Sequence, residues 1–243
     1  MAKEVMSRKE RLQKEREDLK KGGSFDTFLM TKEGKYRMRA LNVGDTEDFA
    51  MEVTYFFLNK DLGGFVSPIT FGDPCYAMEK YEELKKSKDE SKKALAEKIK
   101  PKKRYAMLHI RYKDDKGKQV DEQNGEKLML LTGGLYGAVL DLFLDDENGD
   151  FTDFKTGYDL KYQRIGTGQF DTEYSVMPCR PTPIDKKYRQ IYNLEEYVRK
   201  LVLPYEDIKE KIDSLLGLNK KKKSSDEPSG KIHTKKKKSK VRE

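Results

Sequence analysis

The chain has 243 residues and a formal net charge of +8, with 35% apolar and 39% charged residues. It holds no apolar run long enough to cross a membrane, and residues 1–21 lack the apolar core of a signal peptide. Its 11 Phe and 14 Tyr exclude a wholly disordered chain, and its two cysteines provide no disulfide framework.

The excess positive charge is confined to the C-terminal end. Residues 219–243 contain 11 basic and 3 acidic residues, which leaves 40 of each sign in the other 218 residues. A nucleic-acid-binding groove in the body would therefore depend on local segregation of charge rather than on an overall excess. The segment 219–243 is expected to be a disordered Lys-rich tail, because it offers little apolar surface to bury.

The N-terminal segment 1–23 is predicted to be a charged helical arm that ends at Gly22-Gly23. Val5, Leu12 and Leu19 form a sparse apolar line along it, which is too short for a coiled coil. A solvated helix and an arm that docks on a neighbour or on DNA both remain open. Residues 24–218 are predicted to form one core with helical insertions.

Strands dominate the first part of this core. Alternation predicts a strand over 36–41, a β-branched and aromatic run predicts another over 50–58, and Gly63-Gly64 predicts the turn after it. Residues 77–99 are predicted to be helical, with a break in the charged stretch 85–93 and an end before Pro101.

A basic run then leads directly into a strand over 104–113. One face of this strand would carry Ala106, Leu108, Ile110 and Tyr112, which suits a core. The other would carry Tyr105, Met107, His109, Arg111 and Lys113. Lys102 to Arg104 lie at the start of this strand. Together with them, the second face has the charges and rings that binding of single-stranded nucleic acid requires. An ordinary half-exposed strand explains the same pattern, and both interpretations remain open.

The last third of the core continues in the same manner. A strand over 126–131 precedes a helix over 133–144, and strands over 158–165 and 173–178 form a hairpin. The hairpin loop gathers Lys161, Arg164, Phe170 and Tyr174, although Tyr162 and Tyr174 could equally belong to the core. A helical pattern over 194–216 is interrupted at Pro204.

No catalytic or metal-binding constellation stands out. The acidic stretch 145–150 resembles a calcium loop, but the spacing places Leu144 and Lys155 at ligand positions, which favours a surface turn. Cys75, Cys179, His109 and His233 show no paired metal-ligand spacing, and no Ser or Cys lies in a nucleophile motif. The sequence therefore predicts no enzyme, no metal and no cofactor.

Taken in order, these features resemble the helix-destabilising single-stranded-DNA-binding proteins of T-even phages and their relatives. The resemblance covers roughly residues 20–185, on pattern rather than identity. Its pieces are Lys21 to Phe25, Tyr36 to Leu41, Asp73 to Tyr81, Lys100 to Tyr105, Gly157 to Gly168 and Tyr174 to Pro178.

The resemblance implies an OB-fold, a small Greek-key barrel with an open binding face, and so a mainly β, α+β architecture. By analogy, the stacking residues would be Tyr105, Phe170 and Tyr174, with Tyr76 and Tyr81 as weaker candidates. The phosphate contacts would be Lys102, Lys103, Arg104, Arg111, Lys161 and Arg164.

Three departures from the family limit the analogy. The T-even proteins hold a zinc with cysteines and a histidine, of which only Cys75 remains, so no zinc is expected. Ala106 replaces the ring that follows the cleft tyrosine. The family's tail is acidic and recruits replication partners, whereas this tail is basic and is more suited to added DNA affinity.

The sequence thus predicts a protein that coats single-stranded DNA without sequence preference in phage replication, recombination or repair. It would act in the cytoplasm of the infected host, with no membrane partner. Self-association along DNA and contact with replication proteins remain open. The alternative is a virion or packaging protein that holds duplex DNA through its basic tail.

Overall fold

The structure is a computed structural model that describes residues 27–28, 33–44, 48–113, 125–166 and 171–218. The predicted N-terminal arm, the Lys-rich tail and Phe170 lie outside these residues. The strands are β1 (Thr27–Phe28), β2 (Gly34–Ala40), β3 (Met51–Asn59), β4 (Gly63–Val66), β5 (Lys102–Lys113), β6 (Lys127–Leu131), β7 (Tyr158–Ile165) and β8 (Glu173–Pro181). The helices are α2 (Tyr76–Lys85), α3 (Glu90–Lys98), α4 (Gly133–Leu144), α5 (Leu194–Arg199) and α6 (Tyr205–Leu216), with 3₁₀ turns η1 (Pro68–Phe71) and η3 (Lys186–Tyr188).

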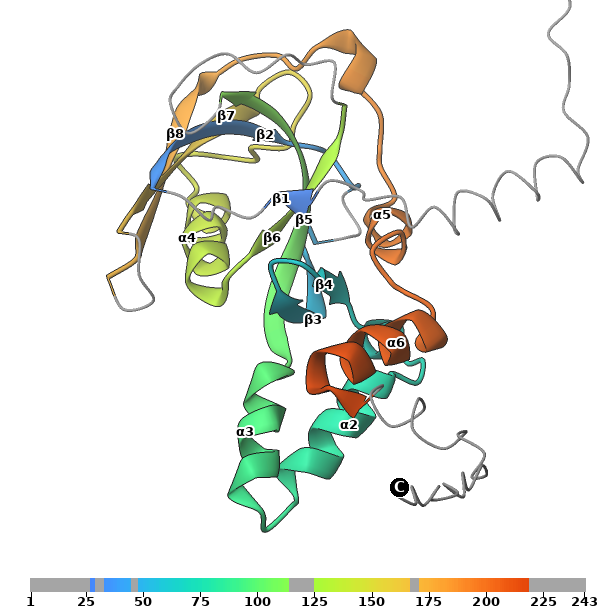
Figure 1. The fold of residues 1–243 in the computed structure, drawn as a ribbon. Coiled ribbons are helices and arrows are strands. Elements are labelled where there is room, and N and C mark those ends of the chain that lie inside the picture. Colours follow the sequence, from blue (N-terminus) through green and yellow to red (C-terminus); the bar gives the residue numbers. More distant parts are fainter. Residues whose placement is uncertain (1–26, 29–32, 45–47, 114–124, 167–170, 219–243) are drawn as a thin grey trace, which may run out of the picture.

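The architecture is mixed α+β, as predicted, and its strands form one curved sheet (Figure 1). Along the sheet the order is β1-β6-β5-β2-β7-β8, and the β3–β4 hairpin joins through β3 to the start of β5. Every ladder is antiparallel except that between β1 and β6. Within the described residues no ladder joins β8 to β6 or β1, so the sheet is not closed into a barrel.

The element boundaries follow local chemistry. The Thr132 hydroxyl accepts from the Leu135 amide and begins α4, and Asp89 caps α3 in the same manner. Pro204 separates α5 from α6 as the sequence predicts. The turn predicted between Leu58 and Phe65 lies at residues 60–62, directly before Gly63-Gly64, where the Asn59 side chain accepts from the amides of Asp61 and Leu62.

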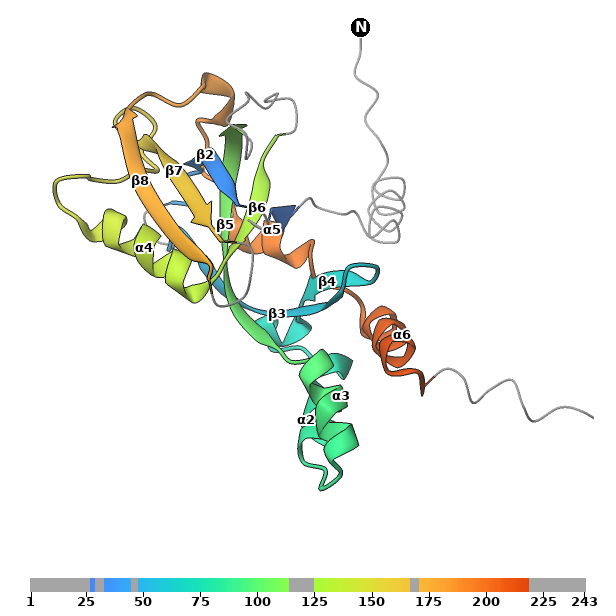
Figure 2. The ribbon, with the colours of Figure 1, turned by 60° about the vertical axis from the view of Figure 1, so that its left-hand side comes forward.

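The core consists of apolar clusters on both faces of the sheet and in a helical lobe. One cluster contains Met38, Met107, Phe151 and Tyr162 beside α4, and a second contains Leu108, Ile110 and Val198 beside α5. The third packs β3 and β4 against α2, α3 and α6, and forms the lower lobe in Figures 1 and 2. Tyr162, one of the rings for which a core position was a rival interpretation, is a core residue.

An internal ion pair fixes β2 against β7. The Arg37 Nε donates to Asp159 Oδ2 over 2.7 Å, and the fully buried Arg39 lies with Nη1 3.6 Å from Asp159 Oδ1. Arg39 Nη2 also donates to the Asp153 carbonyl over 2.8 Å. Asp159 lies near the start of β7, and the predicted site residue Arg164 lies near the end of the same strand. None of the described helices is both long and apolar enough to span a bilayer.

Candidate nucleic-acid interface

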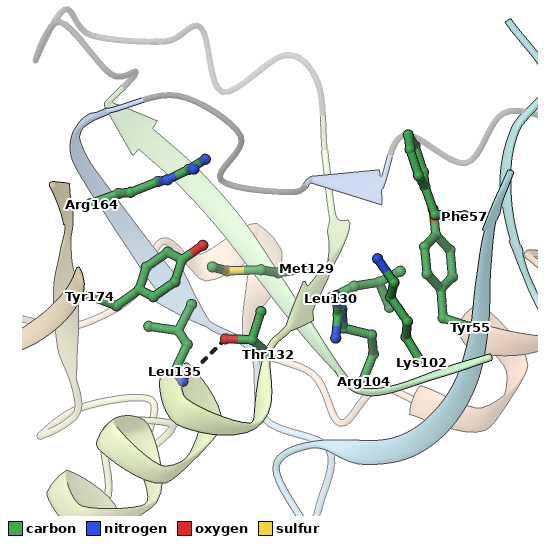
Figure 3. Close-up of a pocket in the computed structure, with 10 residues that line it drawn as sticks. All are labelled: Tyr55, Phe57, Lys102, Arg104, Met129, Leu130, Thr132, Leu135, Arg164 and Tyr174. Atoms are coloured by element: carbon green, nitrogen blue, oxygen red, sulfur yellow. Dashed lines mark hydrogen bonds between the residues drawn. The ribbon is translucent and has the colours of Figure 1, made fainter. Parts of the chain in front are cut away.

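A cavity of about 330 Å³ lies where the sheet fails to close, between the edge of β6 and the β7–β8 hairpin. We call it the seam cavity. In Figure 3, Arg164 and Tyr174 stand on one side of it and Lys102 and Arg104 on the other, with Met129, Leu130 and Thr132 between them. The complete lining comprises Tyr55, Phe57, Lys102, Arg104, Met129, Leu130, Thr132, Leu135, Arg164 and Tyr174. Four of the nine predicted site residues therefore meet at one cavity.

Two of its cations come from the start of β5. Lys102 and Arg104 are two residues apart, so the pleat places both on one face of the strand. Lys102 is exposed, whereas Arg104 is partly buried and donates through Nη1 to the Lys103 carbonyl over 2.9 Å. Burial lowers the pKa of the Arg104 guanidinium, and the phenols of Tyr174 and Tyr55 oppose that shift. Arg104 thus lies within electrostatic reach of rings on both sides of the cavity.

The opposite side is built by the β7–β8 hairpin. Arg164 and Tyr174 are direct partners in the ladder, and the guanidinium carbon lies 6.0 Å from the ring centroid. Arg164 Nη2 donates to Thr172 Oγ1 over 3.2 Å, and only 8% of the residue is exposed. This ring and this cation are therefore held in a fixed relation, as a preorganised ligand site requires.

Between the two sides the cavity is apolar. Met129, Leu130 and Leu135 are almost fully buried, and Thr132 uses its hydroxyl to cap α4. At the far end Tyr55 is buried while Phe57, two residues on, leaves 43% of its surface exposed. The arrangement offers positive charge at its edges and apolar or aromatic surface within, which suits a ligand with anionic and flat uncharged parts.

Tyr105 does not line the cavity. It faces α4, where its ring stacks on that of Tyr136 with centroids 3.9 Å apart and an angle of 7°. Lys103 shares this side of β5, where Nζ lies 5.6 Å from the Tyr105 ring centroid and 2.6 Å from Glu52 Oε2. Hydrogen bonding to the Glu52 carboxylate raises the pKa of the Lys103 amine. Tyr105 and Lys103 thus form one aromatic and ionic cluster with Tyr136 and Glu52.

The predicted open face of β5 is therefore wrong in part. Met107 and His109 were expected on the solvent side with Tyr105, but their exposed fractions are 1% and 0%. The reason is tertiary: Met107 belongs to the cluster in which Leu135 and Val139 of α4 cover this face of the sheet. Alternation separates the two faces of a strand but does not reveal that both are covered.

The remaining predicted residues are separated from the cavity or cannot be placed. Lys161 is exposed on the face of β7 opposite to Arg164. Arg111 pairs with Met38 through the backbone of β5, and its side chain lies outside the described residues, as does Phe170. The weaker candidates Tyr76 and Tyr81 lie in the helical lobe, where the Tyr76 hydroxyl donates to Asp213 over 2.7 Å.

Sequence reasoning missed several lining residues. Tyr55 and Phe57 lie two residues apart in β3, the strand that pairs with the basic residues at the start of β5. Tyr55 is the direct partner of Lys102 in this ladder. Their spacing could have marked them as one aromatic face. Met129 and Leu135 carry no such signal, because an apolar residue that forms a cavity floor looks like any core residue in sequence.

The described residues provide no set of three or more His, Cys, Asp or Glu side chains that could hold a metal ion. A comparison of the sequence with models of known protein families finds no match, and a comparison with curated proteins finds none either.

Proposed function

We propose that the protein binds single-stranded DNA without sequence preference, with the strand crossing the seam cavity. The observation that carries the proposal is the convergence of Lys102 and Arg104 from β5 with Arg164 and Tyr174 from β7–β8 around an apolar floor. Phosphates would lie against the cations, and unpaired bases would lie on Tyr174, on Phe57 or in the cavity. A duplex would present only phosphates here, because its bases are paired and stacked.

We also propose that the sheet is an OB-like barrel with one open seam, into which α2 and α3 are inserted before β5. An OB-fold is a five-stranded, partly open Greek-key barrel that uses a strand face and its neighbouring loops for ligands. The curved, largely antiparallel sheet and a cationic, aromatic cavity at its unpaired edges support this assignment. The sheet is not purely antiparallel, because its β1–β6 pair is parallel.

The test is fluorescence anisotropy of a labelled dT20 strand with the full chain and with a full-length variant in which Lys220–Lys223 and Lys235–Lys238 are changed to Gln. The second protein removes the nonspecific contribution of these lysines. Three cations at the cavity predict that log affinity for dT20 falls against log salt with a slope of about −2, from about −0.7 per phosphate contact. A twenty-base-pair duplex should compete poorly with dT20.

The virion or packaging alternative predicts the opposite result. Duplex and single strand would then compete equally, and neutralising the eight lysines would abolish binding of both. Retained preference for dT20 in the neutralised variant supports strand coating, whereas loss of all binding refutes it.

A further inference from the structure

The C-terminal end of α4 presents an apolar surface surrounded by carboxylates. Leu144 leaves 67% of its surface exposed and Phe143 leaves 37%, although the Phe143 ring also contacts Phe49 and Phe151 at centroid distances of 5.1 and 5.4 Å. Isolated exposed apolar residues need no explanation, but two adjacent ones at the end of a helix form a surface that a partner can cover.

The charge around this surface has one sign. Residues 133–154 contain six acidic residues and no lysine or arginine. The carboxylates of Asp141, Asp145, Asp146, Glu147 and Asp150 belong to exposed residues, and no basic side chain among the described residues lies within 4 Å of them. Near the start of α4 further carboxylates act on Tyr136, whose pKa is raised by burial and by Asp48 and Glu52. We call Phe143, Leu144 and these five carboxylates the α4 acidic face.

The chain itself contains the complementary surface. Residues 219–243 hold all of the molecule's excess positive charge, and they continue from Leu218 at the end of the described residues. Each surface also has an apolar residue next to its charges. Ile232 lies three residues before the run Lys235–Lys238, and Leu144 directly precedes Asp145, Asp146 and Glu147. Lysine stems also cover apolar surface while their amines stay in solvent.

Distance does not prevent the contact. The helices α4 and α6 are well separated in both ribbon views (Figures 1 and 2). Lys235 follows Leu218 by 17 residues, which at about 3.3 Å per residue span up to roughly 55 Å when extended. That reach is comparable to the diameter of a domain of this size.

We propose that the Lys-rich segment 219–243 docks on the α4 acidic face of the same chain, with its lysines against the carboxylates and an apolar residue on Leu144. Docked lysines would be withheld from other polyanions, so a nucleic acid would have to displace the segment before recruiting its charge. The docking does not rest on the proposed DNA binding, and its test contains no DNA.

The test is carbodiimide cross-linking of the full chain at low salt, followed by peptide mass spectrometry. Carbodiimide joins an amine directly to a carboxylate, so it reports contacts without a spacer. Docking predicts that Lys235–Lys238 link mainly to Asp145, Asp146, Glu147 and Asp150. A merely tethered segment would instead link to Glu79, Glu82 and Glu83 of α2, which packs against α6 next to the segment's origin.

Two matched variants examine the apolar part. Leu144→Ser should reduce links between the segment and the acidic face by about threefold or more, because each buried methylene contributes appreciably to docking. Ile191→Ser removes a side chain of similar exposure, 70%, in the loop before α5 and should leave the links unchanged. Neither residue is buried, so both variants should fold, which circular dichroism checks.

A mixture of isotope-labelled and unlabelled chains decides which chain supplies the segment. Links confined to one isotope population support docking within a chain. Links between populations, links concentrated on α2, or equal effects of Leu144→Ser and Ile191→Ser each overturn the proposal.

Discussion

The two sides of strand β5 differ in chemistry although the residues that make them are neighbours in sequence. Arg104 points to the seam cavity, where cations flank an apolar floor, while Tyr105 points to α4, where its ring lies between Tyr136 and the Lys103 amine. Carboxylates accompany the second side, through Glu52 beside Lys103 and Asp48 near Tyr136. A body with no net charge can therefore separate a surface suited to phosphate from one that repels it.

The largest expected effect tests whether the cavity side binds bases. Tyr174→Ala should weaken dT20 binding by about 1–3 kcal/mol, or roughly 5- to 150-fold, because a stacking ring is removed. Anisotropy titration at fixed salt measures it. Tyr174→Leu is the matched control: it keeps apolar bulk against the core but lacks the ring, so it should lose nearly as much. Affinity restored by leucine would show that Tyr174 only packs.

Adjacent cations sharpen the comparison further. Arg104→Gln should reduce the magnitude of the salt slope by about 0.7, since one phosphate contact is lost, whereas Lys103→Gln should change it little. Lys103 is on the α4 side, and its amine already lies 2.6 Å from the Glu52 carboxylate. The salt slopes are measured for both variants in the protein whose Lys220–Lys223 and Lys235–Lys238 are changed to Gln, and they show which side of β5 contacts phosphate. Equal reductions would place the DNA on both sides of β5.

Much of the fold was predictable because its elements have strong local signals. The helix over 133–144 and the interruption at Pro204 have the predicted positions, and the charged stretch after Lys85 does break the helix. These features depend on periodicity, capping and proline, which act over a few residues.

The site was only partly predictable, because it depends on which distant segments meet. Basic and aromatic residues in β5 and the hairpin loop were identifiable as candidates, and four of them do line one cavity. That Tyr105 would instead stack on Tyr136 depends on how α4 crosses the sheet, which no pattern within β5 encodes. Phe57 and Met129 join the cavity for the same reason, through the pairing of β3 and β6 with β5.

A smaller effect is expected on the α4 side. Tyr105→Ala should lower the free energy of unfolding by about 0.5–1.5 kcal/mol from the lost ring stack, with some further loss of buried apolar surface. Urea unfolding measures this change. Affinity for dT20 should stay within about twofold of the parent, because Tyr105 does not line the seam cavity and is not expected to stack on a base. A large affinity loss with unchanged stability would return Tyr105 to the binding surface.

The smallest effect is electrostatic and compares one tyrosine on each side. Burial raises the pKa of both Tyr136 and Tyr55 above the ordinary value of 10.0, but Asp48 and Glu52 raise the first further while Arg104 lowers the second. Asp48→Asn should therefore lower the pKa of Tyr136, and Arg104→Gln should raise that of Tyr55. Carbon-13 NMR of the labelled phenol carbons follows both titrations.

The sign of the accompanying stability change follows from proton binding. When the folded pKa of Tyr136 is raised, the folded state keeps a phenolic proton that the unfolded chain releases above about pH 10. This contribution to stability is complete below pH 10 and is lost as the pH rises through the folded pKa. Asp48→Asn lowers the folded pKa of Tyr136 toward the unfolded value, so the pH range over which this stability is lost becomes narrower. Unchanged titration of Tyr136 in this variant would mean that the Asp48 carboxylate is too well screened by solvent to raise the pKa of this phenol, and that it does not distinguish the two sides of β5.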